Sequence, residues 1–188
     1  MITLRSASPA DAPALLAVYA RYIGTPVTFE CALPAETEFA RRVEDITAVY
    51  PYLAAEEDGA VTVYAYAHPF AERAAYQWGA ELSVYLDPGY CGRGLGRRLY
   101  TALLDLLRLQ GVRTVYGVVT LPNPASEALH RSLGFTRAGV FHNAGFRLGQ
   151  WRDVAWFQKD IGPYDTPEPL RKLRDVDEAL VRDILRRA

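Results

Sequence analysis

Apolar positions recur along the chain with two different spacings, which predict a mixture of helices and strands. Intervals of three and four residues, as on one face of an amphipathic helix, mark residues 9–23, 36–49, 94–110, 124–133 and 170–185. Alternating or continuous apolar runs, typical of strands, mark residues 2–4, 52–56, 60–67, 80–86, 115–120 and 154–159. Because strands and helices alternate between residues 80 and 133, the pattern favours an α/β or α+β fold over a helical bundle.

Turn and capping residues set several boundaries of these elements. Ser8-Pro9-Ala10-Asp11 predicts a helix start, with serine as N-cap, proline at the first helical position and an acid in the first turn. Asp58-Gly59 lies between two strand runs and predicts a hairpin. Gly111 directly follows the stripe at 94–110, and we expect it to end that helix.

The composition places the chain among globular proteins. Of its 188 residues, 50% are hydrophobic and 23% are charged, which excludes disorder as the main state. No run approaches the roughly 20 apolar residues that span a bilayer, and no secretory signal is recognisable, so we expect a soluble cytoplasmic protein with no membrane partner. Two cysteines, Cys31 and Cys91, and three scattered histidines provide neither a disulfide scaffold nor the spacing of a metal site.

The net charge of -1 conceals an uneven distribution along the chain. Residues 1–90 carry 12 acids against 5 bases, residues 91–161 carry 4 against 10, and residues 162–188 carry 6 of each. A nucleic-acid-binding domain usually has a clear positive charge overall, so the balance argues against a nucleic-acid partner. The basic middle segment is nevertheless suited to a compact anion.

A glycine- and arginine-rich segment lies between a predicted strand and a predicted helix: Cys91-Gly92-Arg93-Gly94-Leu95-Gly96-Arg97-Arg98. Glycines allow backbone N–H groups to approach an anion, and a helix start adds partial positive charge, so the arrangement suits phosphate. A Walker loop is excluded because no Lys-Ser or Lys-Thr follows, and a dinucleotide fingerprint because Arg97 replaces its third glycine. The alternative is a tight turn with solvated arginines.

The segment resembles the coenzyme A pyrophosphate loop of the GNAT family of N-acetyltransferases. Further matches are TFE at 28–30, YPYL at 50–53, Arg73-x-x-Tyr76-x-Trp78, LPNPAS at 121–126, LHRSLGF at 129–135 and AGFRLGQWRDV at 144–154. Together they are similar to the phosphinothricin acetyltransferase branch, over residues 2 to about 161. The resemblance implies a mixed, strongly twisted sheet of six to seven strands with helices on both faces, and a homodimer. It divides the chain into an acetyltransferase domain at 1–161 and a helical extension at 162–188, which covers the sheet, joins a dimer or packs as a tail.

The same resemblance implies acetyl-CoA as co-substrate, no metal, and direct transfer in a V-shaped gap between the strands ending at Leu86 and Thr120. The pantothenyl chain is expected along Val84 and Leu86, where a main-chain N–H would polarise the thioester carbonyl. The other expected coenzyme contacts come from the loop and the next helix start: Gly92, Arg93, Gly94, Leu95, Gly96, Arg97, Asn123 and Ser126. Cys91 stands where the family usually has Gln or Arg, so one pyrophosphate contact is in doubt; it is an inert small residue or a redox-sensitive thiol.

Acetyl transfer to an amine requires a neutral amine, a donor to the developing oxyanion and a stabilised thiolate leaving group. Taken alone, a glutamate that alternates with Ser83 and Tyr85 is more often part of a solvated strand face. Because Glu81 lies ten residues from the loop and matches the family's acidic residue on this strand, it is the candidate proton acceptor. His130 is the second candidate, since the branch has histidine there, and an imidazole serves as acid or base near neutral pH. Its alternative role is to cap a local polar network.

The resemblance places the acceptor amine at Phe29, Arg73, Tyr76 and Arg147. Arginines suit a carboxylate or phosphinate, although Arg147 replaces the commoner lysine and Leu148 a frequent histidine. The expected function is N-acetylation of a small amino acid or analogue of the phosphinothricin, methionine sulfone or methionine sulfoximine type. The alternatives are acetylation of a peptide, protein or polyamine, and a non-catalytic acyl-CoA-binding module.

Overall fold

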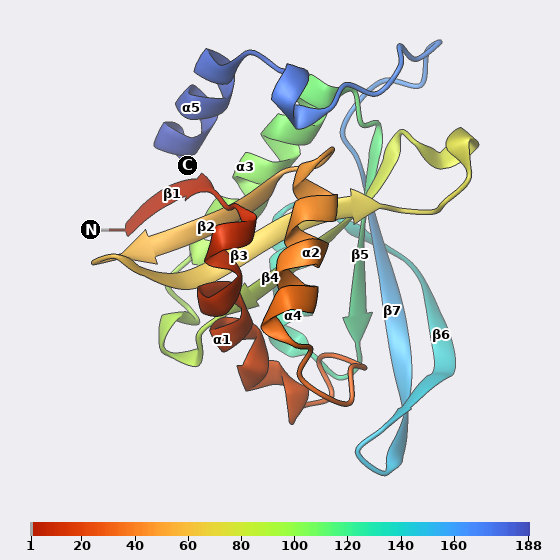
Figure 1. Cartoon of the computed structure of the whole chain (residues 1–188). Helices are drawn as coiled ribbons and strands as arrows, with labels where there is room; N and C mark the ends of the chain where they lie inside the picture. Colours follow the sequence, from red (N-terminus) through yellow and green to blue (C-terminus); the bar gives the residue numbers. More distant parts are fainter. Residues whose placement is uncertain (1) are drawn as a thin grey trace.

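A computed structural model describes residues 2–188, which fold around a twisted mixed sheet of seven strands (Figure 1). The strand order across the sheet is β1-β2-β3-β4-β5-β7-β6. Neighbouring strands are antiparallel except β4 and β5, which are parallel. The bounds are β1 (Ile2–Ser6), β2 (Tyr52–Glu57), β3 (Ala60–Pro69), β4 (Gly79–Leu86), β5 (Thr114–Thr120), β6 (Thr136–Arg147) and β7 (Gln150–Asp160). The expectation of an α+β fold with a mixed sheet of six to seven strands is confirmed.

Helices cover both faces of the sheet. On one face lie α1 (Ala12–Ile23) and α2 (Glu36–Thr47), whose apolar side chains Leu15 and Val43 form a core with Tyr64 of β3. On the other face lie α3 (Leu95–Gln110), α4 (Pro124–Ser132) and α5 (Glu178–Arg187). There, Leu99 and Leu103 of α3 pack on strand residues including Leu82.

Strand β4 carries different chemistry on its two faces. Leu82, Val84 and Leu86 belong to the core around α3. Tyr85 instead contacts the α1 side, with its ring centroid 5.0 Å from that of Tyr19. Because side chains alternate along a strand, Glu81 lies on this α1 and α2 face as well.

The two parallel strands separate part-way along their length. Residues pair from Gly79 with Thr114 to Leu82 with Gly117, and the pairing stops there although β4 and β5 both continue. The strands diverge beyond this point, so β4 has an edge without a strand partner inside the sheet. The V-shaped gap expected from the family resemblance is present.

The predicted turn residues adopt the conformations that their positions require. Asp58 and Gly59 have φ angles of 52° and 83°, as a tight hairpin turn needs, and Gly111 has φ 95° where it ends α3. At the first helix, the Ser8 N–H donates to the Asp11 carboxylate over 2.8 Å. A 3-10 turn over Pro9–Asp11 precedes α1.

Two parts of the fold differ from the sequence expectation. Strand β6 was not predicted, and β7 begins four residues before the expected start at Val154. The reason is that β6 is mostly exposed and lacks apolar alternation. It pairs with β7 through a hairpin turn at Leu148 and Gly149, which have φ angles of 52° and 74°.

The single helix expected at 170–185 is wrong. The backbone N–H groups of Arg171 and Leu173 donate to the carbonyls of Gln110 and Val49, so this part of the extension follows the core, with a short 3-10 turn over Leu173–Asp175 in place of an α-helix. Helix α5 begins only at Glu178, where the Asp177 carboxylate accepts the Ala179 N–H and caps the helix.

Within residues 2–188, no helix combines the length and the apolar character that a membrane crossing requires. The same residues contain no group of three or more His, Cys, Asp or Glu side chains placed to hold a metal ion.

Candidate active site

A cavity of about 640 Å³ opens where β4 and β5 separate. Its walls come from the end of β4, the glycine-rich loop, the start of α3, the end of β5 and helix α4. Most of the expected coenzyme contacts line it, namely Val84, Leu86, Gly92, Gly94, Leu95, Gly96, Arg97, Asn123 and Ser126, as does the candidate catalytic residue His130. The structure therefore brings residues that are far apart in the sequence to one hollow, which Tyr22 and Val27 also line.

The glycine-rich loop presents backbone donors to this cavity. Gly92 and Gly94 have φ angles of 75° and 78°, which side-chain-bearing residues rarely adopt, so glycine is needed at both positions. Gly94 is the N-cap of α3, and no side chain within the described chain bonds to that helix end. The first N–H groups of α3 and its positive dipole end are thus left for an anion.

The arginines of the loop have different roles. Arg97 is exposed and lines the cavity. Arg93 does not line it: one Nη donates to Glu57 over 3.3 Å, and the guanidinium lies 4.6 Å from the centroid of the Tyr90 ring. Arg93 therefore braces the loop against the end of β2, while Arg97 supplies positive charge at the hollow. Cys91 is exposed and lines the cavity.

Tyr22 of α1 occupies part of the free edge of β4. Its hydroxyl donates to the Leu86 carbonyl over 2.7 Å and lies 3.2 Å from the Leu86 N–H, in position to accept from it. Leu86 was expected to pair with the pantothenyl chain, so Tyr22 competes for the same backbone groups. The sequence contained no signal for this contact, because Tyr22 lies in another helix and meets Leu86 only in the folded chain.

The start of α4 forms the opposite rim. The Asn123 side-chain oxygen accepts the Ser126 N–H over 3.1 Å and caps the helix. Asn123 thus caps α4, and it faces the cavity together with Ser126.

His130 is held in one orientation by its surroundings. Its side chain is buried, with only 2% of the residue exposed, and the ring stacks 5.0 Å from the ring of Phe157. Nδ1 lies 2.8 Å from the Ser126 carbonyl, which can only accept, so Nδ1 carries a hydrogen. Nε2 has no hydrogen-bond partner within the described chain. Burial lowers the pKa of His130, so the ring is neutral with its lone pair on Nε2.

Glu81 approaches the gap from the opposite face of the sheet. It is directly cross-strand from His68 on β3 and from Tyr116 on β5, one residue before the last β4–β5 pair. Its carboxylate oxygen Oε1 lies 3.6 Å from Nε2 of His68. Glu81 does not line the large cavity, although the next residue on its face, Ser83, does. The two candidate catalytic groups thus lie on opposite sides of the point where the strands part.

Two of the four expected acceptor residues meet where the β6–β7 hairpin contacts the loop after α1. Arg147 donates to the Thr28 carbonyl over 3.4 Å and to the carbonyl of Ile23. The ring of Phe29 lies directly against Gly145, so closely that a β-carbon there would overlap it. The guanidinium of Arg147 is therefore used to hold backbone in this chain.

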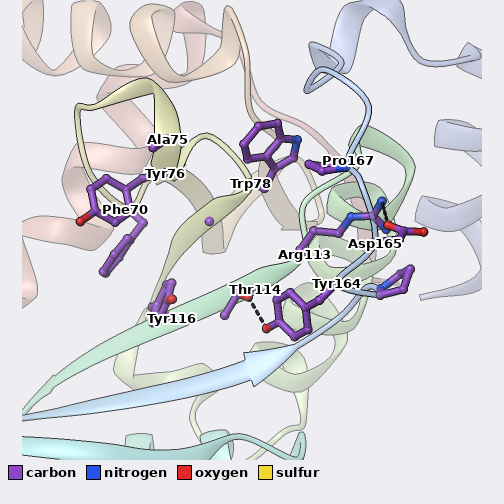
Figure 2. A pocket seen from close by; sticks show the side chains of 12 residues that line it. Phe70, Ala75, Tyr76, Trp78, Arg113, Thr114, Tyr116, Tyr164, Asp165 and Pro167 are labelled. Atoms are coloured by element: carbon purple, nitrogen blue, oxygen red, sulfur yellow. Dashed lines mark hydrogen bonds and ion pairs between the residues drawn. The ribbon is translucent and has the colours of Figure 1, made fainter.

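The other two lie in the loop between β3 and β4. Tyr76 lines a smaller pocket of about 270 Å³ whose aromatic walls Figure 2 shows, and its ring packs edge-on against Phe70. Arg73 is exposed and is not part of the lining. The four residues therefore form two groups and do not converge within a single chain.

This smaller pocket is on the Glu81 side of the sheet. Gly79, two residues before Glu81 on β4, and Tyr116, opposite Glu81 on β5, both line it. Phe70 stacks on Tyr116 with 4.0 Å between ring centroids. Arg113 lies on the far wall, where it donates to Asp165 over 2.9 Å (Figure 2). The sequence did not indicate this pocket, since the loop at 161–168 that closes it carries no recognisable motif.

The chain is similar to known acetyltransferases over most of its length. Residues 4–156 match the family model described as an acetyltransferase (GNAT) domain. The chain is 36% identical over 178 residues to a phosphinothricin N-acetyltransferase of Streptomyces viridochromogenes, covering 94% of this chain and 96% of that protein. It is 34% identical over 119 residues to an L-methionine sulfoximine/L-methionine sulfone acetyltransferase of Salmonella typhimurium, covering 63% of this chain and 70% of that protein.

Among solved structures, the fold matches that of a GNAT superfamily phosphinothricin acetyltransferase from Sinorhizobium meliloti, determined in complex with acetyl-CoA. The TM-score is 0.85 and the identity is 35%, and the alignment covers 94% of this chain and 96% of that chain.

Proposed function

The chain belongs to the GNAT acetyltransferase family, and from this premise we propose that it transfers acetyl from acetyl-CoA to the amino group of a small amino acid or amino-acid analogue. The observation that carries the proposal is the cavity at the β4–β5 gap. It joins an uncapped helix start, suited to a pyrophosphate, to an unpaired strand edge, suited to an extended amide chain.

The backbone of this chain supplies the coenzyme contacts in the proposal. N–H groups of residues 92–97, together with the exposed Arg97, bind the pyrophosphate. The edge of β4 around Val84 and Leu86 pairs with the pantothenyl amides once the Tyr22 hydroxyl moves aside. A β4 N–H at this edge also donates to the thioester oxygen as it becomes an oxyanion.

We propose that Glu81 prepares the acceptor. Its carboxylate takes a proton from the ammonium group, which leaves a neutral amine with a free lone pair. Its position on the α1 and α2 face assigns the acceptor to that side of the sheet, with the smaller aromatic pocket beside it. The coenzyme then reaches the gap from the side of α3 and α4.

His130 acts in the following step of the proposal. Its neutral Nε2 accepts the proton that the attacking nitrogen loses when the new C–N bond forms, and the ring returns that proton to the sulfur as the C–S bond breaks. To act as an acid in the resting enzyme, His130 would have to be an imidazolium, and burial disfavours that charged form. The lowered pKa therefore supports the base as the first role of His130 in this proposal.

The proposed acceptors are phosphinothricin, methionine sulfone and methionine sulfoximine, because the relatives carry these names and cover most of the chain. The test measures release of the coenzyme thiol with each member of a panel of acceptors. The panel contains these three compounds, unmodified amino acids such as glycine, a peptide with a free N-terminus and a polyamine. We expect turnover of the amino-acid analogues. Turnover of peptides or polyamines alone would contradict the substrate assignment, and binding of acetyl-CoA with no turnover on any acceptor would indicate a non-catalytic module.

We also propose a homodimer and a cytoplasmic location. Cys31 and Cys91 are both exposed and unpaired within the described residues, as suits a reducing compartment. The β6–β7 hairpin exposes Phe146 and Trp151 by 61% and 63%, and neighbouring exposed apolar side chains are typical of an interaction surface. We assign a second copy of the chain to this surface.

A further inference from the structure

His68 and Glu81 form a charged pair on neighbouring strands. The two residues are directly opposite each other in the β3–β4 register, and His68 Nε2 lies 3.6 Å from Glu81 Oε1. The side chains are 31% and 21% exposed, so the pair is partly shielded from solvent. The proposed catalytic sequence does not use His68, and nothing in the family motifs singles it out.

The surroundings of the His68 ring favour its doubly protonated form. Nδ1 lies 3.1 Å from the Pro69 carbonyl, and Nε2 faces the Glu81 carboxylate, so both nitrogens face oxygen acceptors without a hydrogen of their own. Burial by itself lowers the pKa of His68, but the hydrogen bond and the charge of Glu81 raise it by more, so the pKa is above its usual value.

The other charged groups on this face have partners of their own. Arg42 of α2 donates to Glu30 over 2.7 Å and to Glu38 over 2.6 Å. The rings of Tyr66 and Tyr116 flank His68 and Glu81 and carry no charge near neutral pH, since burial raises the pKa of both. Among the described residues, His68 is therefore the cation that the structure pairs with Glu81.

We infer that His68 is a positioning residue, whose imidazolium holds the Glu81 carboxylate turned so that its second oxygen, Oε2, meets the acceptor amine. The inference rests on the proposed role of Glu81. His68 binds Oε1 from the β3 side, which restricts rotation of the carboxylate about its own axis. It takes no proton from the substrate itself.

The first test is the pH dependence of kcat/KM in His68→Gln. Glutamine keeps a hydrogen-bond donor but removes the charge and the titration of the ring. Because the pKa of His68 is raised, wild type keeps the imidazolium near neutral pH and loses it as the pH rises further. We expect the ratio of wild-type to His68→Gln kcat/KM to fall as the pH rises through the His68 midpoint. The matched control is His142→Gln, which breaks another histidine–carboxylate contact, 2.8 Å from Asp153 on the exposed β6–β7 hairpin. That variant should keep the wild-type pH profile of kcat/KM.

The second test does not depend on activity. In the full-length protein with isotope-labelled histidines, the imidazole signal of His68 is titrated in wild type and in Glu81→Gln. We expect the His68 midpoint to fall by at least about half a unit in the variant, while His142 is unchanged. An unmoved His68 midpoint would overturn the pairing.

The two tests separate the possible failures. If no acceptor is acetylated but the His68 midpoint falls in Glu81→Gln, the proposed function fails and the pair stands. If the midpoint falls but His68→Gln keeps the wild-type pH profile of kcat/KM, the pair exists without a role in catalysis, and the positioning inference is overturned.

Discussion

His130 is kept neutral by the same packing that fixes its position. Its ring lies between Tyr100, Phe135 and Phe157, with centroids 5.7, 5.1 and 5.0 Å away. These apolar rings lower the pKa of the imidazole because they cannot solvate a charge. The Ser126 carbonyl then selects the tautomer with Nε2 free. The packing around His130 thus fixes both the position of the proposed base and its neutral tautomer.

The lowered pKa of His130 has a consequence for acid stability. Above about pH 6.5, the ordinary histidine value, folded and unfolded chains are both neutral at this residue. As the pH falls below that value, the unfolded chain takes up a proton that the folded chain refuses, so stability is lost until the pH passes the folded pKa.

His130→Gln should therefore lose less of its stability than wild type between about pH 7.5 and about pH 5.5. The measurement is the urea midpoint at the two pH values, with His142→Gln as the exposed control. Equal losses in wild type and His130→Gln would contradict the assignment of a neutral buried ring.

Tyr22→Phe tests whether the Tyr22 hydroxyl blocks the strand edge. The change removes the two contacts to Leu86 and leaves the ring in place. If the pantothenyl chain uses those backbone groups, acetyl-CoA should bind several-fold more tightly, since a competing hydrogen bond contributes about 1 kcal/mol. Calorimetric titration of acetyl-CoA measures the change, and unchanged or weaker binding would remove Leu86 from the coenzyme site.

At the level of elements, the β4–β5 gap depends on how α4 packs against β5. A β-carbon at Gly117 would lie only 2.1 Å from Nε2 of His130. Gly117 is the last residue of β5 that pairs with β4, and it has to be glycine for the imidazole to lie there. At Gly117, therefore, the pairing of β4 with β5 ends, and the missing side chain leaves room for the proposed base, His130.

Gly117→Ala should displace His130 and destabilise the fold by about 1–3 kcal/mol, with a large loss of kcat. Gly139→Ala in β6 is the matched control, because a β-carbon there would meet nothing within 4 Å. Denaturant unfolding and turnover measured on both variants decide the question. Wild-type kcat in a folded Gly117→Ala protein would contradict the role of His130.

At the level of the whole molecule, the chain buries one apolar core on each face of the sheet but leaves the β6–β7 hairpin uncovered. Phe141, Phe146, Leu148 and Trp151 are each exposed by half or more. Arg147 lies next to the turn of this hairpin and Phe29 packs against Gly145 nearby, so a partner bound there would stand close to two of the expected acceptor residues.

The proposed dimer predicts the effect of a charge on that surface. Phe146→Asp should shift the molecular mass by light scattering from dimer to monomer, because burying an unpaired carboxylate in an apolar contact is unfavourable. Leu180→Asp is the control, since Leu180 is also exposed, at 48%, but lies on α5, away from the hairpin. A monomeric wild type, or a dimer unaffected by Phe146→Asp, would contradict the assignment.

The regular parts of the fold could be predicted from the sequence because their apolar periods are strong. The helix 95–110 and the strands around Gly79 and Thr114 are examples. Strand β6 could not, because an exposed strand has no buried face to impose alternation. The extension was mistaken for one helix because its apolar residues contact the core from an irregular backbone.

In the candidate site, too, local features could be predicted from the sequence and contacts between distant segments could not. Features formed within one segment, such as the glycine loop, were visible in the sequence as local motifs. Contacts between distant segments were not: Tyr22 on Leu86, His68 on Glu81 and Glu57 on Arg93 depend on strand register and helix packing, which single residues do not reveal.

A crystal structure with acetyl-CoA bound tests the proposed site most directly. We expect the pyrophosphate on the N–H groups of residues 92–97 and the pantothenyl chain in the gap between β4 and β5. The thioester should lie where Glu81 approaches from one face and His130 from the other. Coenzyme bound outside this gap, or a thioester out of reach of both side chains, would contradict the proposed function at its centre.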